Sequence, residues 1–125
     1  MTALYIGIAG GLGSMSRFLM GTWVAQIFGD KSAMPLHTLT VNVLGSLLMG
    51  ILVGILSTRG EVDSRLRMII GIGFLGGFTT YSSFALETVA FLEERSWQHA
   101  TWYMALTFAG AGFACFAGLM VGRRL

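Results

Sequence analysis

The sequence contains little charge, almost no proline and almost no cysteine. Only 11% of its 125 residues are charged, whereas 54% are hydrophobic, a balance outside the usual range of soluble domains. The single cysteine, Cys115, excludes an intramolecular disulfide. Eighteen glycines against one proline are typical of transmembrane helices that pack closely, because small residues let backbones approach. We therefore expect one small domain, residues 1–125, that resides in the lipid bilayer.

The placement of charge narrows the function classes further. The eight Lys and Arg residues lie mostly at the ends of apolar runs and not in one patch, which argues against nucleic-acid binding. His37 and His99 lack neighbours with the spacing of a zinc or iron site, so neither is assigned a ligand role. The first apolar run has no positively charged start and is interrupted by Arg17. It is therefore predicted to be a retained membrane helix and not a signal peptide.

Four apolar segments have about the 20 residues that a helix needs to cross the hydrocarbon core. They cover residues 3–28, 36–56, 68–92 and 100–121. The predicted fold class is all-α, an integral, multi-pass protein with four transmembrane helices. Five basic residues outside the spans fall on the side of the termini and two on the other, namely Arg59, Arg65, Arg67, Arg123 and Arg124 against Lys31 and Arg95. This modest excess favours termini inside the cell and leaves insertion in both orientations open.

Small residues recur at intervals of four along each segment, which places them on one helix face. Such stripes are typical of helix contacts in membranes. They comprise Gly7 with Gly11, Gly13 with Gly21 two intervals on and Arg17 between them, Gly50 with Gly54, Gly73 with Gly77, and Gly110, Ala114, Gly118 and Gly122. The two halves of the chain share no repeat, and four helices enclose little interior. A homodimer is the economical way to supply the second half of an ion path.

The third segment contains a stretch that favours a helix break. Residues 76–84 read GGFTTYSSF, in which two glycines precede a run of hydroxyl side chains. At membrane depth, backbone groups freed by a break are tolerated only where they are buried or line an ion path. We therefore predict a broken third helix at the functional site. Hydroxyls and aromatic ring edges suit an anion there, whereas freed carbonyl oxygens suit a hard cation.

Other polar residues also lie at membrane depth. Asn42 has Thr38 and Ser46 one turn to either side, so the three form a polar line on one helix face. Asn42 is expected either to hydrogen-bond a neighbouring helix or to line the ion path. Arg17 and Glu87 are the charged residues inside the apolar spans. Each is expected to have a structural role or to lie at a pore mouth or vestibule.

Three motifs occur in order along the chain. They are GGLGSMSRF at residues 10–18, TLTVNVLGSLLMG at residues 38–50, and GGFTTYSSF at residues 76–84 followed by Glu87. At these residues the sequence resembles the CrcB/Fluc family of fluoride channels, and the resemblance covers nearly the whole chain. It implies passive, fluoride-selective efflux across the cell (inner or plasma) membrane and fluoride resistance. No covalent chemistry is involved, so the protein is not expected to be an enzyme.

The resemblance also implies an architecture and a set of sites. Members of the family are antiparallel, dual-topology homodimers with two pores and a structural sodium ion buried at the dimer centre. Backbone carbonyls that match Gly76 and Thr79 hold this ion. The implied fluoride path comprises Asn42, Tyr81, Ser82, Ser83 and Phe84, and Tyr103 is a further candidate in the fourth segment.

The chain departs from the family pattern at a few positions. Tyr81 replaces a phenylalanine, which keeps the ring edge and adds a phenol. Ser83 replaces a threonine, and His37 stands where glycine is usual. The first of these changes lies at the centre of the implied path.

Two other functions remain open from the sequence. Small multidrug or cation proton antiporters are also four-helix, dual-topology dimers, and Glu87 would then be the proton-coupled carboxylate. Such transporters place their glutamate in the first helix, where this chain has none. A packing subunit of a larger complex would explain the glycine stripes but would leave the hydroxyl run without a purpose.

Overall fold

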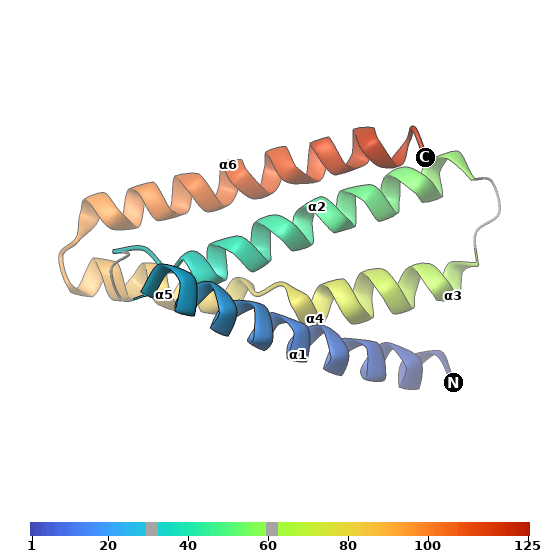
Figure 1. The fold of residues 1–125 in the computed structure, drawn as a ribbon, viewed down its shortest axis with the longest axis horizontal. Coiled ribbons are helices and arrows are strands. Elements are labelled where there is room, and N and C mark those ends of the chain that lie inside the picture. Colours follow the sequence, from blue (N-terminus) through green and yellow to red (C-terminus); the bar gives the residue numbers. More distant parts are fainter. Residues whose placement is uncertain (30–32, 60–62) are drawn as a thin grey trace.

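The computed structural model describes residues 1–29, 33–59 and 63–125. All secondary structure in these residues is helical (Figure 1), which confirms the all-α class. Four helices in the described part are long and apolar enough to cross a membrane, and the third of them, Ser64–Glu93, is interrupted. The elements are α1 (Thr2–Phe28), α2 (Leu36–Thr58), α3 (Ser64–Arg67), the π-helical η2 (Met68–Leu75), α4 (Gly76–Phe78), α5 (Tyr81–Glu93) and α6 (Trp97–Gly122).

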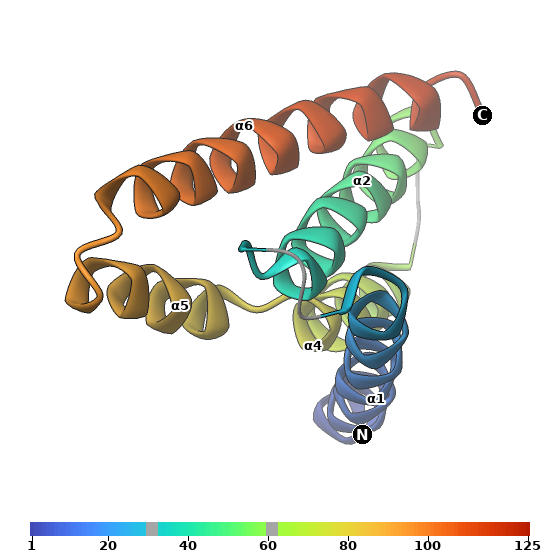
Figure 2. The same cartoon turned by 60° about the vertical axis from the view of Figure 1, so that its left-hand side comes forward.

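The helices form two packed pairs, which are joined by a contact between α1 and α2. Helix α2 packs chiefly on α6, while α1 packs on η2 and α4 and also contacts α2. Successive long helices run in opposite directions, so both termini lie at one end of the molecule (Figure 1). Beyond the interruption, α5 leans away from α1 towards the start of α6 (Figure 2). The third helix therefore contacts different neighbours before and after its break.

Glycines let α2 and α6 approach until their backbones touch. A Cβ added at Gly50 would overlap the carbonyl group of Cys115, and one added at Gly118 would overlap the carbonyl group of Leu47. Gly54 and Gly122 approach each other equally closely further along the pair. The contact faces predicted for these two segments are confirmed here. Close van der Waals packing of this kind stabilises helix pairs in lipid, where no hydrophobic force acts between them.

A second glycine contact joins α1 to the first half of the third helix. Gly13 lies against the carbonyl group of Phe74, and a Cβ added at Gly77 would overlap the backbone of Gly10. By contrast, a Cβ at Gly7 or Gly11 would meet nothing within 4 Å in the described part of the chain. The stripe predicted for these two residues is therefore wrong as a contact within one chain.

Large apolar side chains cover the outer faces of α1 and α6. Leu19, Phe113 and Phe116 are 64%, 77% and 62% exposed, respectively. A helix that is apolar on its outer face as well as its inner face is stable in lipid or against another protein surface, but not in water. The fold is accordingly that of a multi-pass integral membrane protein, as the sequence predicts.

Candidate functional site

The third helix is interrupted by two residues of extended backbone. Thr79 and Thr80 have φ/ψ angles of −85°/159° and −148°/113° between α4 and α5. The predicted break is present, but it lies just beyond the glycine pair. Gly76 and Gly77 are helical and belong to α4. Gly77 is required for its close approach to Gly10, so the glycines serve packing and the threonines form the break.

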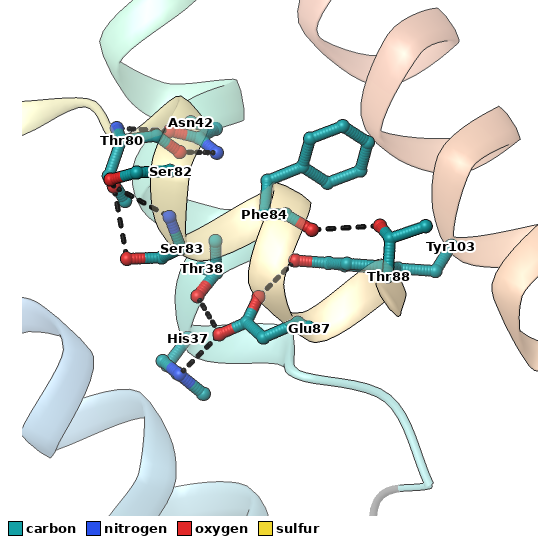
Figure 3. Close-up of polar contacts among 10 residues, drawn as sticks. All are labelled: His37, Thr38, Asn42, Thr80, Ser82, Ser83, Phe84, Glu87, Thr88 and Tyr103. Atoms are coloured by element: carbon teal, nitrogen blue, oxygen red, sulfur yellow. Dashed lines mark hydrogen bonds and ion pairs between the residues drawn. The ribbon is translucent and has the colours of Figure 1, made fainter. Parts of the chain in front are cut away.

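Asn42 on α2 satisfies the backbone of the break. Its Oδ1 accepts a hydrogen bond of 2.8 Å from the Thr80 N–H, and its Nδ2 donates one of 2.9 Å to the Thr80 carbonyl (Figure 3). Both residues are buried. Extended backbone in a membrane has no helical partners, and an unpaired peptide group there costs several kcal/mol, about the value of a lost hydrogen bond in hydrocarbon. The interhelical hydrogen bond expected of Asn42 is therefore present, and it stabilises the extended backbone of the break.

The hydroxyl run begins α5. The Thr80 hydroxyl accepts a hydrogen bond of 3.2 Å from the Ser83 N–H, as an N-cap does. It also donates to the Ser83 hydroxyl at 3.0 Å and lies 3.4 Å from that of Ser82. The cluster therefore holds the first turn of α5 in place, and its hydroxyls remain polar groups at membrane depth.

Two carbonyl groups near the break receive hydrogen bonds from α1. Arg17 Nη1 donates to the Thr79 carbonyl at 3.2 Å, and the Ser14 hydroxyl donates to the Gly77 carbonyl at 3.4 Å. Arg17 thus anchors the break, one of the roles expected of it. Sequence reasoning missed Ser14, whose only signal was a hydroxyl in the first motif.

The carbonyl oxygens of Gly76 and Thr79 are suitable ligands for a hard cation, but two ligands are too few to bind one. The N–H of Thr80, which would pair with the Gly76 carbonyl in a continuous helix, is used by Asn42. A carbonyl oxygen has two lone pairs, so Thr79 can accept from Arg17 and still bind an ion. Oxygen ligands are those that hard cations prefer, yet such ions take more than two of them. Gly76 is exposed on the surface of the chain.

Glu87 on α5 is the acceptor of a polar cluster that joins α2, α5 and α6. Its carboxylate accepts hydrogen bonds from Thr38 Oγ1 at 2.7 Å and from the Tyr103 hydroxyl at 2.5 Å (Figure 3). His37 Nε2 lies 3.3 Å from Oε1 of the same carboxylate. Thr38 and Tyr103 are buried, so Glu87 is held by specific partners instead of extending to the membrane surface. The contact of His37 was not foreseen, although its departure from the family pattern was visible.

A broad cavity of about 1010 Å³ lies between α2, the break and α6. We call it the inner cavity. Asn42, Ser46, Tyr81 and Phe84 all line it, so these four predicted residues are brought together. The rings of Tyr81 and Phe84 have centroids 5.8 Å apart, and that of Phe84 lies 5.2 Å from Tyr103.

The inner cavity also contains a hydroxyl that the sequence reasoning missed. Thr107 on α6 lines it and is buried. Its Oγ1 has no hydrogen-bond partner among the residues that the structure describes. Ser46, in contrast, donates its hydroxyl to the Asn42 carbonyl in its own helix at 2.7 Å. Thr107 is therefore a buried hydroxyl of this cavity that is free to bind a ligand.

A smaller cavity of about 370 Å³ lies on the other side of the break, between α1, α2 and α5. We call it the vestibule. Its polar lining residues are Arg17, Thr22, His37, Thr38, Thr80, Ser83 and Glu87. Thr80 lines the inner cavity as well. The residue that Asn42 binds is therefore shared by both cavities.

The fold and the site together define a small, multi-pass membrane protein in which a broken helix separates two cavities that each contain polar side chains, an arrangement typical of transport proteins. Comparison with known families specifies it further. The chain belongs to the CrcB family: the family described as "CrcB-like protein, Camphor Resistance (CrcB)" matches residues 4–119.

Curated relatives match along nearly their whole lengths. The fluoride-specific ion channel FluC of Caulobacter vibrioides (strain NA1000 / CB15N) is 41% identical, over 98% of this chain and 95% of the relative. FluC of Caulobacter sp. (strain K31) is 41% identical over 100% of this chain and 98% of the relative. FluC of Novosphingobium aromaticivorans is 40% identical over 98% of each chain.

Proposed function

We propose that the protein is a fluoride-selective channel, through which fluoride leaves the cell passively and which thereby confers fluoride resistance. Membership of the CrcB family supports this, as do relatives that carry the name fluoride-specific ion channel at about 40% identity over almost the entire chain. The protein is not an enzyme, because transport of an ion forms and breaks no covalent bond.

The observation that carries the proposal is the chemistry of the inner cavity. None of the described residues that line it is charged, while it offers an amide, hydroxyls and aromatic rings. Fluoride that leaves water needs donors to replace its hydration shell, and the positive edges of aromatic rings can serve as such. A fixed positive charge would bind the anion too strongly for release. Neutral donors therefore suit conduction.

The proposed path runs from the vestibule past Thr80 into the inner cavity. The Asn42 amide has two N–H groups, of which one binds the Thr80 carbonyl, so the second is available to an ion. Thr107 offers its unpaired hydroxyl, and the rings of Tyr81 and Phe84 offer their edges. Ser83 contributes its hydroxyl from the vestibule.

The proposed assembly is an antiparallel, dual-topology homodimer. Tyr81 and Phe108 line the inner cavity although they are 80% and 86% exposed, so the cavity opens to the surface of the single chain. A second copy would close it and would supply further carbonyls beside Gly76 and Thr79. We propose that these carbonyls hold a structural sodium ion at the dimer interface, where the ion would neutralise the converging oxygens.

The test of the proposed function is ion flux from liposomes that contain the purified protein. Fluoride efflux, measured with a fluoride electrode, is expected to be far faster than chloride efflux. Equal rates, or no flux from a folded dimer, would refute the proposal. Replacement of internal and external sodium by a large organic cation is expected to reduce flux or dimer stability. Proton-coupled uptake of a lipophilic cation would instead support the antiporter.

The first specific prediction concerns Phe84. Phe84→Ile keeps an apolar side chain but removes the ring edge, so fluoride flux is expected to fall about tenfold, the equivalent of roughly 1.4 kcal/mol. Size-exclusion chromatography should give the dimer position of the parent protein. Phe113→Ile, on the exposed outer face of α6, is the matched control and should conduct normally. An unchanged rate in Phe84→Ile would remove ring edges from the mechanism.

A further inference from the structure

His37 lies where the vestibule meets a neighbouring cavity. It is in the first turn of α2, and its side chain is 48% exposed. Together with Glu87 it lines both the vestibule and a second cavity of about 430 Å³ beside it. An ion that moves between these two spaces therefore passes the His37 and Glu87 pair.

The carboxylate of Glu87 opposes an anion at this point. Thr38 and Tyr103 hold its two oxygens, but both donors are neutral hydroxyls and leave its charge in place. An anion that approaches an uncompensated carboxylate is repelled, and the repulsion is stronger at a partly buried site than in water. Glu87 is 22% exposed. Access to the vestibule therefore depends on how this charge is balanced.

Few other charged groups face His37. Arg17 of α1 lines the vestibule but donates to the Thr79 carbonyl, and Glu94 of α5 lines the neighbouring cavity. From α6, Tyr103 meets only the far oxygen of Glu87. Among the described residues, His37 is thus the titratable cation closest to this carboxylate. His99 stacks on Phe91, with centroids 5.8 Å apart, and makes no such contact.

We propose that His37 is a proton-responsive residue that controls access of fluoride to the vestibule, an inference that rests on the proposed function as a fluoride channel. Histidine is the side chain that changes charge between about pH 5 and 8. The protonated ring donates from Nε2 to Glu87 across the existing 3.3 Å contact, so charge changes without rearrangement. Protonation neutralises the carboxylate and removes the repulsion. Fluoride flux therefore rises as pH falls.

The expected effect is moderate, because the pair is partly exposed to solvent. Ion pairs of this exposure change equilibria by about two- to fivefold. Flux per channel is therefore expected to be about two- to fivefold higher at about pH 5.5 than at about pH 7.5. Protein-free liposomes at each pH supply the correction for hydrogen fluoride, which crosses lipid unaided.

The experiment compares the wild-type protein with His37→Gln and His99→Gln in the same liposomes. Glutamine retains an N–H that can donate to Glu87 but cannot gain a charge, so His37→Gln should lose the pH response. His99→Gln should retain it. An equal pH response in all three proteins, or no pH response in the wild type, would overturn the inference alone. Absence of fluoride flux at both pH values would overturn the proposed function itself.

Discussion

The vestibule and the inner cavity share Thr80 but differ in charge. Arg17, His37 and Glu87 bring three ionisable side chains to the vestibule. The inner cavity, in contrast, has no charged side chain among its described lining residues. The vestibule is also the smaller of the two, at about 370 Å³ against about 1010 Å³.

In the proposed channel, this difference separates the region that attracts the anion from the region that conducts it. Positively charged groups at a mouth, such as Arg17, concentrate an anion from solution and act over the screening length of the salt. Deeper in a membrane the same charges would trap the ion, since conduction requires binding weak enough for release. The boundary between the two cavities is Thr80, whose N–H and carbonyl both form hydrogen bonds with Asn42.

The largest effect is expected when that boundary is removed. Asn42→Ala leaves the N–H and carbonyl of Thr80 without partners, and each unsatisfied buried group costs about 1–3 kcal/mol. Loss of fluoride flux by about a hundredfold or more is expected, with a lower melting temperature in detergent.

Ser46→Ala is the matched control for Asn42→Ala. Its hydroxyl lies one turn further along α2 and bonds only the Asn42 carbonyl. Its flux and melting temperature should stay within about twofold and a few degrees of the parent values, as expected for loss of one hydrogen bond within a helix. If Asn42→Ala behaved like this control, the break would not depend on Asn42.

The sequence predicted which residues form the site better than it predicted the contacts between them. The four spans and the broken third helix follow from hydropathy and local sequence, whereas the convergence of Asn42, Tyr81 and Phe84 was implied by the family resemblance of the motifs. The exact position of the break could not be predicted. The glycine pair suggested a break at residues 76 and 77, but Gly77 is a glycine because it packs against Gly10 of α1. A pattern within one helix can predict a contact face, but it does not show which residue of another helix lies against it.

The Glu87 cluster illustrates the same limit. Its members come from two neighbouring residues of α2, one of α5 and one of α6. Nothing in the spacing of His37 and Glu87 indicates that they meet, so His37 was assigned no role. The contact joins α2 to α5, which leans away from α1 beyond the break (Figure 2).

An intermediate effect is expected from loss of charge in the vestibule. Arg17→Gln removes the guanidinium that lines the vestibule and bonds the Thr79 carbonyl. Flux at low ionic strength is expected to fall about tenfold, and the deficit should shrink at high salt, where screening weakens attraction.

Arg17→Lys separates the two roles of the arginine. Lysine keeps the charge but loses the planar donor geometry. It should restore most of the flux if attraction matters, and little of it if the bond to Thr79 matters. A flux deficit in Arg17→Gln that is independent of salt would show that the vestibule does not act by charge and would remove the contrast between the two cavities.

The smallest effect is expected at Tyr81. Its ring lines the inner cavity beside Phe84, while its phenol hydroxyl has no hydrogen-bond partner among the described residues and the side chain is 80% exposed. If a neutral cavity conducts through ring edges, Tyr81→Phe keeps the working group, because both rings have a positive edge. Fluoride flux should then change by less than about twofold, the value of a weak exposed contact. A larger fall would make the phenol a donor to the ion, and a larger rise would mean that the hydroxyl holds the ion or its water too strongly for rapid release.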